Sequence, residues 1–211
     1  MSQGLEELRD AHPELFAPRH LWSRTEVLSR PCPVPKNPGV YAWYFKRIPS
    51  GVPAADCLTV GGSALLYVGI SPKAPPRNDR PPSRQNLRIR LRQHFCGNSD
   101  GSTLRLTLGC LLAPELGLEL RCIGDGDCLT FCGGEVRLSE WLGENALVTW
   151  KECSEPWLLE PKLIQQLTLP LNLDQNQRHP FHPTLSAIRK ASKETARRLP
   201  IWSPAPATTR S

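Results

Sequence analysis

Two stretches of the chain show the apolar pattern of β-strands. Residues 39–45 read GVYAWYF and residues 64–70 read ALLYVGI, and both are rich in the aromatic and β-branched residues that fit a pleated surface. A long turn region separates them, so we expect the two strands to pair in an antiparallel manner. A further strand is predicted at ALVTWKEC (146–153), and two short ones at LELRCI (118–123) and CLTFC (128–132).

Helical periodicity dominates the rest of the chain. NLRIRLRQHF (86–95) places apolar residues on one stripe with arginines around it, which predicts a helix that begins near Gln85. Ser102 is a candidate N-cap for the next helix, and Pro161 is expected to bend or restart a later one. The other helices are predicted in one or two short pieces within 1–30 and over residues 102–113, 137–146, 155–169 and from the 180s to about 199.

Composition narrows the class of protein. The chain is 39% hydrophobic and 22% charged, as in soluble globular proteins, and its 22 prolines predict long irregular connections. No apolar run reaches the ~18–20 residues that span a bilayer, and no secretory signal is evident, so we expect a cytoplasmic protein without a membrane partner. The eight cysteines therefore do not predict a disulfide framework. Cys122, Cys128 and Cys132 lack the paired C-x2-C spacing of a zinc site.

The net charge of +6 is concentrated in the sequence. Seven basic residues and one acid, Asp79, lie between positions 73 and 92, and such a cluster favours a polyanionic partner such as a nucleic acid. The basic residues are Lys73, Arg77, Arg80, Arg84, Arg88, Arg90 and Arg92. A second basic group near the C-terminus, from Arg189 to Arg198, fits a solvated helix face equally well.

Several polar residues could converge in this order of elements. The set suits attack on a phosphodiester: a carboxylate holds Mg²⁺ or Mn²⁺, an arginine contacts the developing charge, and a base activates water. Arg90 and His94 lie one helical turn apart and share a face. The candidate catalytic residues are Tyr41, Tyr67, Arg90, His94, Glu160 and Asn172. Trp43 shares the strand parity of Tyr41 and is a candidate for the edge of the same cleft.

These residues lie in motifs that resemble the GIY-YIG nucleases. The resemblance is carried by GVY (39–41), YVG (67–69), NLRIRLRQH (86–94), LLEPKLIQQL (158–167) and PLN (170–172). It implies an α/β fold of the α+β type, in which helices flank a small three-stranded antiparallel sheet. It further implies that Gly39 and Gly69 permit close backbone approach.

The resemblance also implies a role for each candidate. One of Tyr41 and Tyr67 would orient or deprotonate the attacking water. Arg90 would contact the scissile phosphate, and His94 would assist in proton transfer or contact the phosphate. Glu160 would be the single metal-binding carboxylate, and Asn172 would support it.

Large insertions separate these motifs from a minimal core, and a C-terminal helix follows them. The expected organisation is an N-terminal helical extension (1–35), a nuclease core (36–175) with insertions at 71–85 and 96–138, a C-terminal helical extension (176–202) and a disordered tail (203–211). Arg88 and Arg92 compete with Arg90 for the catalytic place, and the spacing to His94 favours Arg90. A tyrosine base needs a nearby cation, because its ordinary pKa is about 10.

The sequence therefore predicts a metal-dependent endonuclease that hydrolyses DNA, with RNA not excluded. The basic loop would track the phosphate backbone through Lys73, Arg77, Arg80, Arg84, Arg88 and Arg92. One alternative is a catalytically silent nucleic-acid-binding protein with the same fold. Another is a scaffold in which the tyrosines and cysteines are core residues. The absence of a separate DNA-reading module favours recognition of strand or structure over strong sequence specificity.

Overall fold

The computed structural model describes residues 3–76 and 83–203. Within these residues the main sheet has four antiparallel strands in the order β2-β3-β1-β6. The three long strands expected from the sequence are present, and a two-residue strand is added at one edge. The strands are β1 (Gly39–Phe45), β2 (Thr59–Val60), β3 (Ser63–Ser71) and β6 (Ala146–Glu152). Residues 204–211 of the predicted tail lie outside the described residues.

Strand β1 is the centre of the sheet and is buried along its whole length. It pairs with β3 on one side and β6 on the other, with Tyr41 opposite Gly69 and Trp43 opposite Tyr67. The register then shifts by one residue between Trp43 and Tyr44, which is a β-bulge. Because the shift follows the Trp43–Tyr67 pair, Tyr41 and Tyr67 remain on the same face of the sheet.

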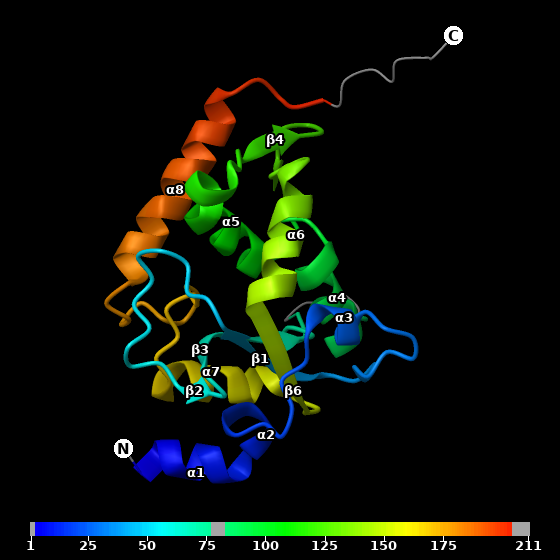
Figure 1. Cartoon of the computed structure of the whole chain (residues 1–211), viewed down its shortest axis with the longest axis vertical. Coiled ribbons are helices and arrows are strands. Elements are labelled where there is room, and N and C mark those ends of the chain that lie inside the picture. The colour runs from blue at the N-terminus through cyan, green and yellow to red at the C-terminus, as the bar shows by residue number, and fades with distance from the viewer. Residues whose placement is uncertain (1–2, 77–82, 204–211) are drawn as a thin grey trace.

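Each face of the sheet is covered by its own group of helices (Figure 1). Val40, Ala42 and Tyr44 pack against α7 and the N-terminal helices in one core, and Tyr41, Trp43 and Phe45 pack against the other helices in a second core. This division follows from the alternation of side chains along β1. The helices are α1 (Gln3–Ala11), α2 (Pro13–Phe16), α3 (Arg24–Val27), α4 (Leu87–Cys96), α5 (Thr103–Leu116), α6 (Gly134–Asn145), α7 (Pro156–Gln166) and α8 (His182–Arg198).

The inserted segment 96–138 contains α5, the start of α6 and a small hairpin. The hairpin pairs β4 (Arg121–Ile123) with β5 (Cys128–Thr130) in an antiparallel manner. Ser102 caps α5, as predicted, by accepting a hydrogen bond from the backbone N–H of Arg105. The Arg105 side chain is fully buried, pairs with Glu135 of α6 and donates to the carbonyl of His94 in α4, so the insertion packs as part of the domain. Helix α8 lies along α5 (Figure 1).

Two local expectations from the sequence need correction. Pro161 does not restart a helix, because α7 continues through it to Gln166. Trp43 does not reach the edge of a cleft. It is completely buried, and its ring makes edge-on contacts with His94 and Phe95, because α4 covers that part of the sheet. Among the described residues, no helix combines the length and apolar character that crossing a membrane requires.

Candidate active site

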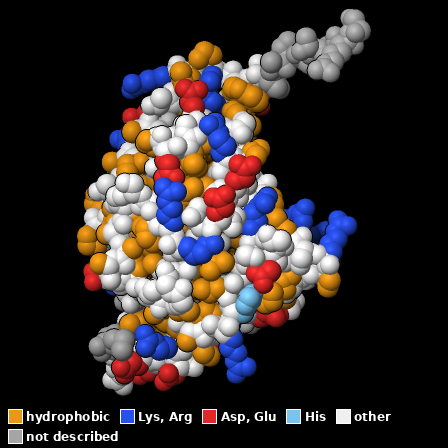
Figure 2. Space-filling view, in the orientation of Figure 1, with side chains coloured by type: hydrophobic (Ala, Val, Ile, Leu, Met, Phe, Trp, Pro, Cys, Tyr) orange, Lys and Arg blue, Asp and Glu red, His pale blue; other side chains and the backbone are white. Residues whose placement is uncertain are grey.

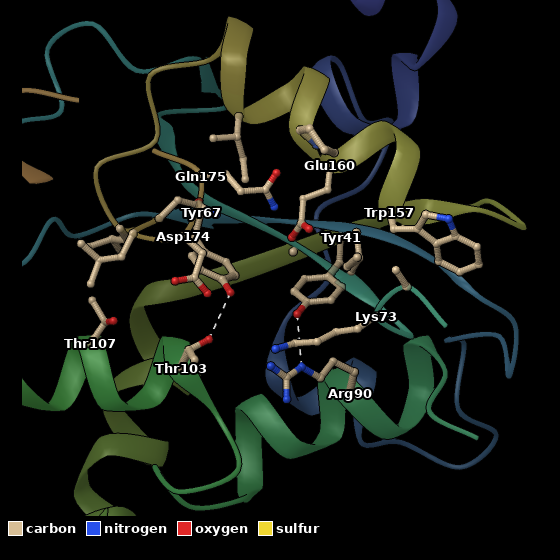
Figure 3. Close-up of a pocket in the computed structure, with 18 of the residues that line it drawn as sticks. Tyr41, Tyr67, Lys73, Arg90, Thr103, Thr107, Trp157, Glu160, Asp174 and Gln175 are labelled. Atoms are coloured by element: carbon tan, nitrogen blue, oxygen red, sulfur yellow. Dashed lines mark hydrogen bonds between the residues drawn. The ribbon is translucent and has the colours of Figure 1, made fainter. Parts of the chain in front are cut away.

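The predicted site residues surround one cavity of about 600 Å³. Its walls come from β1 and β3, from α4, α5, α7 and α8, and from the segments that follow β3 and α7. Five of the six candidate catalytic residues line it: Tyr41, Tyr67, Arg90, Glu160 and Asn172. Figure 3 shows Tyr41 and Arg90 on one side of the space and the Glu160 carboxylate facing them from α7.

Tyr41 lies directly over Gly69 of the paired strand. A Cβ atom at Gly69 would lie 2.6 Å from the Tyr41 hydroxyl oxygen and 2.8 Å from Cζ, which no relaxed structure permits. Gly39 is enclosed in a similar way by the backbone of Lys151 and the side chain of Leu87. The glycines of the two motifs therefore permit the close approaches expected from the sequence.

His94 does not line the cavity. It is fully buried behind Tyr41, with Nε2 2.8 Å from the Tyr41 hydroxyl and Nδ1 2.7 Å from the Ser102 hydroxyl. Burial, and then the nearby Arg90 and Arg105, hold the pKa of His94 well below its ordinary value, so the imidazole is neutral. A contact with the phosphate, one of its two expected roles, is not available from this position.

The hydrogen bonds of Ser102 select the tautomer of His94. The Ser102 oxygen already accepts from the Arg105 backbone N–H, and an unpaired buried hydroxyl proton would cost about 1–3 kcal/mol. The Ser102 hydroxyl therefore donates to Nδ1, which leaves Nε2–H to donate to Tyr41. Because Arg90 Nε also donates to the Tyr41 oxygen at 3.3 Å, the tyrosine's own proton is left for the cavity.

Arg90 is held firmly at the wall of the cavity. Besides the bond to Tyr41, its Nη1 donates to the carbonyl of Gly101 at 2.8 Å and to Gln93 Oε1 at 3.1 Å. No described residue accepts a hydrogen bond from its Nη2. This nitrogen is available to an anion in the cavity, as expected for a phosphate contact.

The hydroxyl groups of Tyr41 and Tyr67 are protonated and uncharged. Burial raises the pKa of Tyr41 far above its ordinary value, and Arg90 offsets only part of that effect. Burial also raises the pKa of Tyr67, whose hydroxyl lies 3.4 Å from Thr103 Oγ1 of α5. The cation that a tyrosine base requires is therefore present, but burial outweighs it.

Glu160 provides the carboxylate that was expected from the sequence to bind a metal. Burial raises its pKa to about 7, and the negative charge of Asp174 adds to the effect, whereas Lys73 and Arg90 oppose it. No group of three or more His, Cys, Asp or Glu side chains converges in the described part of the chain. A hard cation such as Mg²⁺ suits this donor set, because it binds through one or two carboxylates and completes its shell with water and phosphate oxygens.

Asn172 supports β3, the strand that carries Tyr67. Its Oδ1 accepts from the backbone N–H of Val68 at 3.0 Å, and its Nδ2 donates to the Val68 carbonyl at 2.8 Å. Val68 stands between Tyr67 and Gly69 on the edge of β3 that β2 is too short to reach. The amide thus replaces a strand partner and fixes the backbone beside both motif residues.

The predicted basic residues have different environments. Lys73 is exposed and lines the cavity, and Arg84 and Arg92 are exposed but do not line it. Arg88 donates to the carbonyls of Val34 and Cys32, which ties α4 to the N-terminal segment. Arg77 and Arg80 lie outside the described residues. Basic and acidic side chains are interspersed over the face shown in Figure 2.

Six further polar or aromatic residues that line the cavity were not selected from the sequence. They are Thr103, Thr107, Trp157, Asp174, Gln175 and Arg189. Trp157 precedes Glu160 by one helical turn and Asp174 follows Asn172 by two positions, so both could have been found from their neighbours. The threonines of α5 and Arg189 of α8 carried no such signal, because only the packing of distant helices brings them to the site.

Comparisons with known proteins point to one family. A family model described as the GIY-YIG catalytic domain matches residues 39–191. The match covers most of the chain, includes the insertions, and ends within α8. No curated protein and no solved structure matches the chain.

Proposed function

The chain belongs to the GIY-YIG family of nucleases, and on this premise we propose that it is a metal-dependent endonuclease that hydrolyses phosphodiester bonds in DNA. Membership of the family implies a nucleic acid as substrate. The choice of DNA rests on the resemblance in the sequence and on the basic residues near the site.

The observation that carries the proposal is the convergence of four groups in one cavity. Tyr41, Tyr67, Arg90 and Glu160 come from four separate elements, β1, β3, α4 and α7, and all line the same space. An electropositive wall with Arg90 and Lys73 faces a carboxylate across it. This arrangement fits a phosphodiester that lies between a bound cation and an arginine.

In the proposed reaction, water attacks the phosphorus atom, one P–O bond breaks, and a proton from the water ends on the leaving oxygen. The products are a strand end with a phosphate monoester and a strand end with a hydroxyl group. Arg90 donates from Nη2 to a phosphate oxygen and balances the charge that develops there. The Tyr41 hydroxyl donates a hydrogen bond to the water or to a phosphate oxygen, and this bond fixes the orientation of the acceptor. His94 is a positioning residue that acts through Tyr41.

Glu160 would hold the divalent cation, and Asp174, which lines the same cavity, would add negative charge near the ion. Mg²⁺ or Mn²⁺ bound there would polarise the phosphoryl oxygen and stabilise the leaving oxygen. Because burial raises the pKa of Glu160 to about 7, the cation and a proton compete for this carboxylate in the neutral range.

The test compares cleavage by the wild-type protein and Glu160→Gln. Substrates are supercoiled plasmid, single-stranded DNA, RNA, and flap and branched DNA, each with Mg²⁺ or Mn²⁺ and with EDTA. We expect wild-type cleavage that requires the metal, and loss of at least about 10²-fold in Glu160→Gln, whose circular dichroism and DNA affinity in EDTA are retained. Glu155→Gln, an exposed residue of the same region, is the matched control and should cleave normally.

Two outcomes would contradict the proposal. Binding of every nucleic acid without cleavage of any would identify a silent nucleic-acid-binding protein with the same fold. Full activity of Glu160→Gln would remove Glu160 from the metal site. The branched and flap substrates also test our expectation that strand structure, rather than sequence, selects the cut.

A further inference from the structure

One cation of the C-terminal helix faces the catalytic cavity. Arg189 lines the cavity and is half-buried. It follows Leu185 by one turn and precedes Ala196 by two on the stripe of α8 that packs against α5, and both of those residues are completely buried. The neighbouring Lys190 is exposed and lies 4.0 Å from Glu194. Arg189 is thus directed inward by helix geometry.

The guanidinium of Arg189 has unused hydrogen-bonding capacity. Nη1 donates to Thr107 Oγ1 at 3.4 Å, and no carboxylate of the described residues forms an ion pair with it. Guanidinium offers five N–H donors, and a cation without an acidic partner at the wall of a cavity is available to an anion that enters it. Thr107 is itself almost completely buried, so it holds Arg189 in place.

The position of Thr107 places this cation away from the chemical centre. In Figure 3, Thr107 and Trp157 lie at opposite ends of the cavity, with Tyr41 and Glu160 between them. Arg90 and Lys73 already provide positive charge in the central part of the cavity, beside Tyr41. The Thr107 end is formed by α5 and α8, so the insertion and the C-terminal helix lengthen the site beyond what one phosphate group requires.

We propose that Arg189, held by Thr107, binds a second backbone phosphate of the same strand, beside the scissile one. The ligand is a phosphodiester of a polynucleotide, and the site rests on the proposed nuclease function. A strand bound at both phosphates is fixed in direction across the cavity, so Arg189 sets which phosphate reaches Arg90 and Glu160.

The first experiment measures binding in EDTA, where no cleavage occurs. Fluorescence anisotropy with a labelled single-stranded oligonucleotide is recorded over a range of salt concentrations for the wild type, Arg189→Gln and Lys190→Gln. We expect Arg189→Gln to lower affinity about tenfold, the loss of one charge-assisted contact. It should also reduce the slope of log K against log salt by about 0.7. Lys190→Gln should change affinity less than about twofold.

The second experiment locates the phosphate. Oligonucleotides in which one phosphate at a time is replaced by an uncharged methylphosphonate are bound by the wild type and by Arg189→Gln. We expect one position at which the replacement weakens binding to the wild type but not to Arg189→Gln, because both changes remove the same contact. In cleavage with Mg²⁺, that position should lie beside the cut.

Other outcomes would overturn the proposal. Equal effects of Arg189→Gln and Lys190→Gln would show only a general charge effect, and the absence of any coupled phosphate would exclude a specific contact. Arg189→Met keeps the apolar stem and replaces Arg189→Gln if that variant unfolds. A wild-type protein that shows the coupling but never cleaves would refute the nuclease function and leave the phosphate site established.

Discussion

Replacing Glu160 with glutamine removes a carboxyl group that the fold holds in an unfavourable environment. Burial, with help from Asp174, raises its pKa to about 7, whereas the ordinary value is 4.5. Glutamine has nearly the same shape and carries no charge. We therefore predict that Glu160→Gln, which should abolish metal-dependent cleavage, makes the metal-free protein more stable above neutral pH.

The magnitude and the pH window follow from this pKa. Between pH 4.5 and about 7 the folded state retains a proton that the unfolded state has lost, so wild-type stability falls as the pH rises. At about 1.4 kcal/mol for each pH unit the full effect is about 3 kcal/mol. Solvent in the cavity screens the half-buried carboxylate, and we expect about 1–3 kcal/mol above neutral pH and less than about 1 kcal/mol near pH 5.

The assay is urea unfolding in EDTA near pH 5 and near pH 8, for the wild type, Glu160→Gln and the exposed control Glu155→Gln. Saturating Mg²⁺ should then stabilise the wild type and the control but not Glu160→Gln. The reasoning is refuted if Glu160→Gln is less stable than the wild type near pH 8, or if its advantage is the same at both pH values.

Three further substitutions test residues that hold the catalytic side chains in place. Gly69→Ala should displace the Tyr41 ring, lower kcat at least about tenfold and lower the unfolding free energy by about 1–3 kcal/mol. Gly133→Ala, with open space around it, should change neither quantity. Cleavage assays and urea unfolding measure the two effects. Ser102→Ala should lose about 1 kcal/mol of unfolding free energy with its helix cap and shift the imidazole ¹⁵N resonances of the buried histidine. Glu135→Ala should lower the unfolding free energy in urea by about 3–5 kcal/mol, because Arg105 is left buried without a carboxylate; a loss below about 1 kcal/mol would contradict this.

Local patterns were sufficient to predict the long elements of the fold. Alternation identified β1 and β3, and the stripe through Leu87 and Leu91 identified α4. The cap at Ser102 located the start of α5, since these signals depend only on neighbours in the chain. The motifs also predicted the cavity residues that lie on or beside those strands and helices.

Long-range packing decided what the sequence could not predict. Trp43 shares a face of the sheet with Tyr41, and His94 shares a face of α4 with Arg90. Trp43 is nevertheless covered by α4 and His94 is buried behind Tyr41, so neither lines the cavity. Arg189 belongs to a helix whose basic residues fit a solvated face. Its inward direction is set by Leu185 and Ala196 packing on α5, which no local pattern specifies.

Arg105 limits how this protein can be simplified or recombined. Its guanidinium donates to the carbonyl of His94 at 3.1 Å and to the carboxylate of Glu135 at 2.6 Å, so a residue of the insertion completes the hydrogen bonding of the helix that bears Arg90. A shortened version without the insertion would expose the end of that helix and lose Ser102 as well. An exchange of segments with another protein of this fold should therefore move α4, α5 and α6 together.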